Sequence, residues 1–287
     1  MEMSVSMASL LLRLSDQFNL KDFATMRMGA LVALSVKSIT PVVRFLTHQF
    51  HLSTLSLGQR IDILEVLTLA ASELSGISEE KSFKKPQELK EELIQVSREI
   101  APTESKVRKW GYLGKNVKKE KLSVNKFAQV AREFFFPLLP KSFYSSSSFR
   151  PLRENFAEQV VDILRLDVIV TTKLLFTLSF FIKCVGRTEH SVKKEMYKEL
   201  ISITMLLRYH KETILRRNCI YAFGSCLDLF SVDTLIEEFA EELQEVHEWF
   251  NSVIEEDPDN DCRNMAALYF NKVLELLKTR SNQLLYF

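Results

Sequence analysis

Residues 255–270 read EEDPDNDCRNMAALYF, and their spacing decides between a calcium site and the start of a helix. Asp257, Asp259 and Asp261 alternate as the first three ligands of a calcium loop would. An EF-hand loop also needs Gly at its sixth position and Glu at its twelfth, where this chain has Cys and Leu. The stretch therefore predicts a helix and no metal site.

The same residues carry the signals of a capped helix. Asp257 is placed to cap the free backbone N–H groups, and Pro258 suits the first helical position because no donor is needed there. Apolar residues then recur at steps of four, three and four, namely Ala266, Phe270, Val273 and Leu277. This spacing is typical of one apolar helical face.

A pattern that begins at the arginine of this stretch recurs along the chain. An arginine is followed three residues later by an apolar, mostly small residue and seven residues later by a larger apolar one. The four copies begin at Arg27, Arg60, Arg216 and Arg263. Because positions three and seven residues further share a helical face, the small residue lets a neighbouring helix approach and the larger one fills the adjacent groove.

This pattern resembles the second helix of a HEAT or armadillo repeat. The resemblance implies that the arginine, Arg263 in particular, meets an aspartate of a neighbouring unit. We expect an all-α protein, a HEAT- or armadillo-like α-solenoid of antiparallel helix pairs, with another all-α bundle as the alternative.

Periodicity and Gly or Pro breaks predict helices along the whole chain. They span about residues 4–18, 22–37, 41–51, 56–75, 87–100, 124–139, 152–165, 167–185, 189–210, 212–230, 232–254 and 258–280. The expected organisation is amino-terminal helical repeats over 1–100, a basic irregular linker over 101–123, and carboxy-terminal repeats over 124–287 that continue the same solenoid.

The net charge is only +1, but the charges are unevenly distributed. Residues 232–261 hold twelve Asp and Glu and no Lys or Arg. Within 105–126 the cations we single out as candidate partner-binding residues are Lys106, Arg108, Lys109, Lys115, Lys118, Lys119 and Lys121. Three interpretations of this basic segment remain open. It is a plain linker, or it docks onto an acidic protein partner or serves as a nuclear-import signal. Alternatively it contacts nucleic acid, with Trp110 and Tyr112 as stacking groups.

No pattern in the sequence indicates an enzyme, a metal or a cofactor. His48 and His51 lie one turn apart, but no third ligand follows at metal-site spacing. The nucleotide-binding, hydrolase and metalloprotease motifs are absent from the sequence. We expect no catalytic activity, no cofactor and no small-molecule substrate.

Other features indicate an intracellular protein. The cysteines lack the spacing of a metal or redox motif and are expected to be reduced and buried, as in the cytosol or nucleus. The amino terminus lacks a basic region and has Arg13 in its apolar part, which excludes a secretory signal. The apolar run 168–182 is shorter than a bilayer span and contains Lys173, so a buried core helix is expected rather than a membrane helix.

Four segments together are similar to one known family. They are GQRIDILEVLTLAASELS (58–75), REFFFPLLPKSF (132–143), LLRYHKETILRR (206–217) and WFNSVIEEDPDNDCRNMAALYF (249–270). In this order they resemble the carboxy-terminal part of the telomere length regulation protein family, from about residue 5 to 278.

The resemblance implies a scaffold without catalytic activity that belongs to the triple-T co-chaperone complex. Its partners would be the other subunits of that complex, the phosphatidylinositol-kinase-like protein kinases, and the heat-shock chaperone that matures those kinases. Location in the cytoplasm and nucleus, with telomere association, would follow. The family's amino-terminal solenoid and its acidic serine linker have no counterpart here. The alternative function is a nucleic-acid-associated protein that contacts telomeric DNA through the basic segment 105–126.

Overall fold

The computed structural model describes residues 2–77, 125–139, 166–186 and 191–285. These residues form helices and contain no strand, which confirms the all-α class. The helices are α1 (Glu2–Arg13), α2 (Phe23–Lys37), α3 (Ile39–Phe50), α4 (Leu57–Ser75), α7 (Phe127–Phe135), the 3-10 turn η1 (Phe136–Leu138), α9 (Val168–Val185), α10 (Ser191–Leu207), α11 (Thr213–Leu227), α12 (Val232–Glu238), α13 (Ala240–Glu256) and α14 (Asn260–Leu285).

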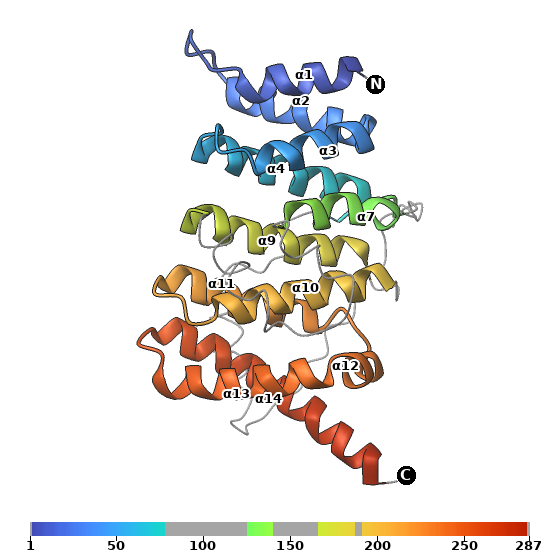
Figure 1. The fold of residues 1–287 in the computed structure, drawn as a ribbon, viewed down its shortest axis with the longest axis vertical. Helices are drawn as coiled ribbons and strands as arrows, with labels where there is room; N and C mark the ends of the chain where they lie inside the picture. The colour runs from blue at the N-terminus through green and yellow to red at the C-terminus, as the bar shows by residue number, and fades with distance from the viewer. Residues whose placement is uncertain (1, 78–124, 140–165, 187–190, 286–287) are drawn as a thin grey trace, which may run out of the picture.

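The helices lie across the long axis of the molecule and stack along it in chain order. Figure 1 shows α1 as the outermost helix at one end and α13 and α14 at the other, with α9 near the middle. Expected helices at 87–100 and 152–165, and the expected linker 101–123, lie outside the described residues. The three-part organisation stays a prediction.

Helix α4 shows how local sequence sets the boundaries. Ser56 and Gln59 form a reciprocal capping box, in which the Gln59 N–H donates to the Ser56 hydroxyl and the Ser56 N–H donates to the Gln59 side chain. The helix ends at Gly76, whose φ of 73° is a left-handed conformation that glycine adopts without strain.

Helix α4 packs directly on α9, although about 90 residues separate them in the chain. The hydroxyls of Thr68 and Thr177 lie 3.2 Å apart in the buried interface, and Lys173 pairs with Glu65 beside it. The described residues on either side of segment 78–124 also meet, because the Lys126 N–H donates to the Leu74 carbonyl at 3.1 Å. The stack therefore continues across this segment.

Helix α9 has the length and apolar composition of a membrane-crossing helix, but 67% of it is buried inside the protein. It contacts α4, α7, α10 and α11. On α7, the rings of Phe127 and Phe134 both contact Phe181 of α9, with centroids 5.6 and 5.7 Å away. This packing is that of the buried core helix expected for residues 168–182.

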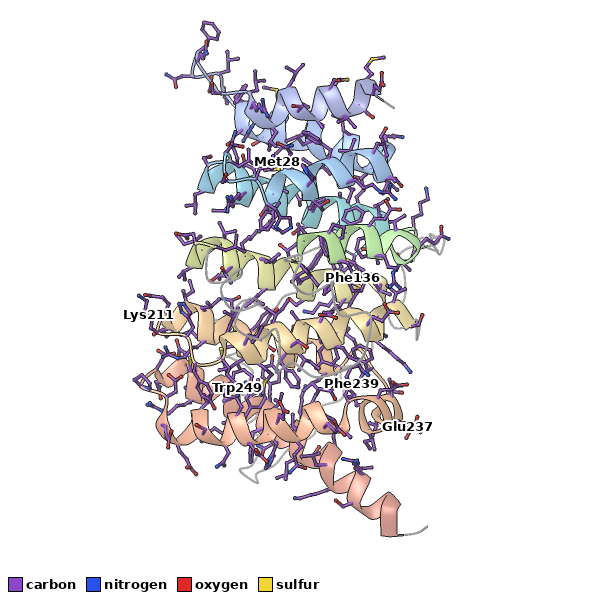
Figure 2. The ribbon with its side chains drawn as sticks, viewed as in Figure 1. Met28, Phe136, Lys211, Glu237, Phe239 and Trp249 are labelled. Carbon is purple, nitrogen blue, oxygen red and sulfur yellow. The ribbon has the colours of Figure 1, made fainter. Side chains whose placement is uncertain are left out.

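An aromatic cluster forms the core of the carboxy-terminal layers. Tyr197 of α10 is fully buried, and its ring contacts Phe223, Phe230 and Phe239. Figure 2 places Phe239 and Trp249 inside the stack, between the layer of α10 and α11 and the layer of α12 and α13.

The expectation of one helix over 232–254 is wrong. The backbone at Phe239 has φ −125° and ψ 19°, which ends α12, and α13 begins at the next residue. The physical reason is burial: Phe239 is 0% exposed, and the change of direction places its ring against Tyr197 and Phe230. The free energy gained by burying this ring exceeds the free energy lost by interrupting the helix.

The expected first helix, 4–18, is also too long at its end. Helix α1 stops at Arg13. The Asp16 carboxylate accepts the backbone N–H groups of Phe18 and Leu20, both at 3.1 Å, and so stabilises a turn instead of another helical turn.

A buried lysine joins three elements of the stack. Lys193 of α10 is 0% exposed, and its ammonium donates to the carbonyls of Leu229 at 2.8 Å and Gly186 at 3.3 Å. It also lies over the Phe230 ring, 4.6 Å from the centroid. These contacts satisfy carbonyls that follow α9 and α11.

Candidate functional site

Two of the four arginines of the repeat pattern join different layers of the stack. Arg27 of α2 pairs with Asp62 of α4 and is 15% exposed. Arg60 donates to the Leu52 carbonyl at 3.0 Å, within the turn that precedes its own helix. The shared sequence pattern therefore does not determine the partner of the arginine, which differs from copy to copy.

Arg216 makes the most buried of these ion pairs. Its Nε and Nη2 donate to the two carboxylate oxygens of Asp257 at 2.8 and 3.0 Å, and the side chains are 11% and 6% exposed. Its Nη1 donates to the carbonyls of His210 and Lys211. One guanidinium thus joins the α10–α11 turn to the α13–α14 turn.

The protonation of this pair follows from its hydrogen bonds. The hydrogen bond to Asp257 raises the pKa of Arg216. Burial acts to raise the pKa of Asp257, but hydrogen bonds from Arg216 and from the Asp259 backbone N–H hold that pKa below its usual value. Both groups are therefore charged at neutral pH.

Arg217 makes a second pair beside the first. It donates to both oxygens of Asp259, and its Nη1 lies 3.1 Å from Asp261. The hydrogen bond from Arg217 is the main reason that the pKa of Asp259 lies well below its usual value. These carboxylates, which alternate like calcium ligands, are engaged by arginines.

The expected role of Arg263 is corrected by the structure. Its guanidinium donates to the Asp257 backbone carbonyl and to the Asn260 side chain, near the start of its own helix. Contacts with an aspartate of another layer are made by Arg27 and Arg216. Arg263 lies after the turn, so its side chain reaches the turn residues of its own helix.

The start of α14 also differs from the expectation. Asp259, not Asp257, accepts the Cys262 N–H at 2.8 Å and caps the helix, which begins at Asn260. Asp257 accepts the Asp259 N–H and is otherwise held by Arg216. Across the described ranges, no group of three His, Cys, Asp or Glu side chains is arranged to hold a metal.

We call the interlayer pairs Arg27–Asp62, Glu65–Lys173, Arg216–Asp257 and Arg217–Asp259 the ion-pair edge. They join α2 to α4, α4 to α9, and α11 to the α13–α14 turn. Because the pairs are partly desolvated and two of them use both carboxylate oxygens, they fix the spacing of successive layers better than exposed pairs would.

A hollow of about 270 Å³ opens at the end of the ion-pair edge, between the α10–α11 and α13–α14 turns. We call it the edge pocket. It is lined by Arg208, Tyr209, His210, Lys211, Arg216, Ser252, Val253, Glu256, Asp257 and Pro258. The Arg208 guanidinium lies 4.9 Å from the centre of the exposed Tyr209 ring, and Lys211 extends into solvent. These groups can bind a polar side chain of a partner.

Part of the acidic region 232–261 is exposed. Glu237 lies on α12, and Glu241, Glu245 and Glu248 follow on α13 at steps of four, four and three residues. We call these four residues the acidic face. Figure 2 shows Glu237 and Lys211 at opposite edges of the stack. The acidic face therefore begins at the edge opposite the edge pocket and runs along α13 towards it.

Several other expected residues are accounted for. The cations Lys106, Arg108, Lys109, Lys115, Lys118, Lys119 and Lys121 lie outside the described residues. His48 and His51 are both exposed, and His51 contacts the Pro137 carbonyl at 2.8 Å. The four cysteines are buried and form no disulfide, which confirms that part of the prediction.

Two features of the site were missed by the sequence reasoning. Arg217 was not singled out, although an arginine pair followed by an alternating aspartate series was visible in the sequence. Asp62 and Asp257 were not assigned as partners of Arg27 and Arg216. Sequence spacing indicates a shared helical face, but it does not show which aspartate the next layer brings close.

The chain is similar to proteins from several vertebrates. Residues 1–71 match the family model described as telomere length regulation protein. The human telomere length regulation protein TEL2 homolog is 34% identical over 300 residues, which cover 99% of this chain and 34% of the human protein.

The mouse TEL2 homolog is 32% identical, with 99% of this chain and 34% of the mouse protein covered. For the Xenopus laevis homolog these values are 28%, 98% and 33%. The chain thus spans about a third of the length of the curated relatives it matches. No solved structure matches it.

Proposed function

Because the chain belongs to the telomere length regulation protein family, we propose that it acts as a non-enzymatic helical-repeat scaffold for large protein kinases. In this role it supports, with the heat-shock chaperone, the maturation and stability of phosphatidylinositol-kinase-like kinases. Telomere maintenance and DNA-damage signalling would depend on it through those kinases.

The observation that carries the proposal is the extent of the similarity. The alignments with the human, mouse and frog relatives run along 98–99% of this chain, so they include every layer of the stack and not one motif. A scaffold uses its whole length in this way, because each repeat contributes both to the rigid body and to the surface.

The geometry supports a scaffold in a second way. The ion-pair edge and the aromatic cluster hold the layers in fixed positions, and the acidic face begins at Glu237, at the edge opposite Lys211 of the edge pocket. A rigid body with separated surfaces can hold two partners at a set distance without changing its own shape. The other triple-T subunits, the kinases and the chaperone machinery are the partners we propose, in the cytoplasm and the nucleus.

The absence of catalysis is part of the proposal, and two observations support it. The relatives are named as regulation proteins. In the edge pocket, Arg216 and Asp257 bind each other, and the His210 Nδ1 accepts the Glu212 N–H at 3.1 Å. These groups are occupied by structural contacts rather than positioned as an acid–base pair.

Co-purification from cells tests the proposal. We would express the tagged chain, a Glu241→Lys/Glu245→Lys variant of the acidic face, and a Glu73→Lys/Glu275→Lys control that changes the net charge equally at exposed sites elsewhere. The kinases and the triple-T subunits are expected with the wild type and the control, and in reduced amount with the acidic-face variant. If the wild-type chain retained neither the kinases nor the triple-T subunits, the scaffold function would be contradicted.

A second variant separates this function from DNA binding. Since the Lys126 N–H reaches the Leu74 carbonyl, residues 78–124 can be replaced by a short Gly-Ser linker that spans the same anchor points. The scaffold function predicts that kinase co-purification survives the replacement. The nucleic-acid function predicts a different result. The wild-type chain would bind DNA with an affinity that falls steeply as salt rises, and the replacement variant would lose both DNA and kinase association.

A further inference from the structure

The edge pocket has the size of a site for one side chain. Its volume of about 270 Å³ lies below the roughly 300–1,000 Å³ that is typical of pockets for small molecules. One wall is the turn between α10 and α11, and the other is the end of α13 with the turn that follows it. Figure 2 shows Lys211 of the first wall at the outer edge of the stack. A side chain of a partner can therefore enter from solvent.

The charges of the edge pocket that are free to meet a ligand are mainly positive. Arg216 and Asp257 bind each other, so they contribute little net charge. The other charged groups on the walls are Arg208 and Lys211, which are cations, and Glu256, which is an anion. None of these three forms an ion pair with another described residue. Two cations against one carboxylate favour an anionic ligand.

Hydrogen-bond donors are in excess on the wall formed by the α10–α11 turn. The Arg208 Nη1 donates to the Met205 carbonyl, but the Arg208 Nε has no partner among the described residues. Because the His210 Nδ1 accepts the Glu212 N–H, the proton of the neutral imidazole lies on Nε2, which is then a donor. Lys211 is exposed, and its ammonium adds further donors. A group that only accepts hydrogen bonds, such as a carboxylate, matches this wall.

Apolar surface lies beside these donors. The Arg208 guanidinium lies 4.9 Å from the centre of the Tyr209 ring, and this cation–π contact holds it in place. Tyr209 is 64% exposed, and Val253 and Pro258 add apolar atoms to the facing wall. These side chains suit an apolar residue next to the anionic one. The pocket therefore fits a segment of peptide better than a free inorganic anion.

We propose that the edge pocket binds a carboxylate side chain of a partner protein, in a segment where an apolar residue adjoins the acidic one. A carboxylate carries a single charge, whereas a phosphorylated side chain carries about −1.5 to −2 at pH 7. Glu256, on the wall of the same pocket, repels the more highly charged group more strongly. The proposal rests on the scaffold function only for the identity of the partner that supplies the carboxylate.

Binding of short peptides to the purified full chain tests the proposal. The probes are capped heptapeptides with a central glutamate between two leucines or two phenylalanines, and saturation-transfer NMR detects their binding even when it is weak. Matched peptides carry glutamine or phosphoserine at the centre. The glutamate peptides should bind about tenfold more tightly than the glutamine peptides, because the latter lose the charge-assisted hydrogen bonds.

Two results with these peptides would overturn the proposal. The first is failure of every glutamate peptide to bind, or binding no tighter than that of the glutamine peptides. The second is tighter binding of a phosphoserine peptide than of its glutamate counterpart, which would exclude the choice of a carboxylate.

Charge variants test whether the peptide binds in the edge pocket. Lys211→Glu should weaken binding of the glutamate peptides about fivefold or more, because a repelling charge replaces an attracting one. Glu256→Gln should strengthen it about twofold, because the anion beside the ligand is removed. Both residues are exposed, so the fold is retained, as unchanged circular dichroism would verify.

The matched control is Lys278→Glu, an equal charge change at an exposed site of α14. It lies roughly 27 Å along the helix from the first residue of α14, so the affinity should stay that of the wild type. Unchanged affinity in Lys211→Glu, or equal losses in Lys211→Glu and in the control, would refute binding in this pocket.

The peptide experiment and the co-purification experiment fail independently. A chain that retains the kinases in cells but binds no glutamate peptide would refute the ligand of the edge pocket and leave the scaffold function standing. A chain that binds the peptide through Lys211 but retains no partner in cells would refute the scaffold function alone.

Discussion

Arg216→Met is the substitution that most directly tests the ion-pair edge. The Arg216 side chain is 11% exposed and that of Asp257 6%, so removal of the cation leaves a buried, unpaired charge. Breaking a buried pair from one side costs about 3–5 kcal/mol. The carbonyls of His210 and Lys211 also lose their donor, but they line the edge pocket and can bind water. We therefore expect a loss of about 4 kcal/mol in the free energy of unfolding, which corresponds to a fall of roughly 10 °C in Tm.

Urea unfolding followed by tryptophan fluorescence measures this loss. The chain has two tryptophans, and in a Trp110→Phe background the signal comes from Trp249, which is 2% exposed on α13. The control is Arg132→Met, whose pair with Glu195 is 56% and 46% exposed. Because exposed pairs contribute little, the control should lose less than about 1 kcal/mol.

The double variant Arg216→Met/Asp257→Asn separates charge burial from packing. An asparagine can still accept the Asp259 N–H, but it carries no charge. We expect the double variant to lose about 2 kcal/mol less than the sum of the single variants. Additive losses, or a loss for Arg216→Met no greater than that of the control, would refute the argument that this pair fixes the layers.

The pH dependence gives an independent check with a definite sign. The pKa of Asp257 in the folded protein lies below its usual value, so the pair contributes stability above about pH 4 and loses it as the pH falls through the folded-state value. The stability curves of the wild type and of Arg216→Met should therefore converge as the pH is lowered from 7 towards 3. A constant difference would contradict an electrostatic origin.

Three further substitutions or reactions test other parts of the core. Gly224→Ala should destabilise the protein by about 1–3 kcal/mol in thermal unfolding, because the added Cβ would lie 2.3 Å from the Tyr269 ring, and Tyr269→Leu should recover part of that loss. Lys193→Met should lower the urea midpoint by an amount equivalent to about 2 kcal/mol, since two carbonyls lose their donor; an unchanged midpoint would contradict that role. Burial raises the pKa of the Cys219 thiol and raises that of Cys226 to about 12, so thiol reagents at pH 8 should label these residues only after unfolding, and rapid labelling of the native protein would contradict their burial.

The helical class was predictable from local sequence. Gly76 and Gly186 end α4 and α9 where the breaks were expected, and both have positive φ. The apolar run 168–182 forms a helix buried in the core. These features depend on residues close together in the chain, and periodicity and turn residues report such interactions directly.

The features that depend on other layers were not predictable in this way. The sequence of residues 232–254 has a helical pattern throughout. The helix nevertheless ends at Phe239, because the Phe239 ring packs in a buried site against Tyr197 and Phe230 of other elements. Asp257 and Asp259 are both adjacent to Pro258 and are similar candidates for the cap. Asp259 takes that role because Arg216 of another layer holds Asp257.

The pairing of α4 with α9 has a consequence for synthesis of the chain on the ribosome. The face of α4 that carries Glu65 and Thr68 meets its partner only after about 90 further residues have been translated, which takes roughly 5–20 s. During that delay the nascent chain exposes the apolar residues beside Thr68 to other molecules. This interval is the stage at which a ribosome-associated chaperone would protect the chain most effectively.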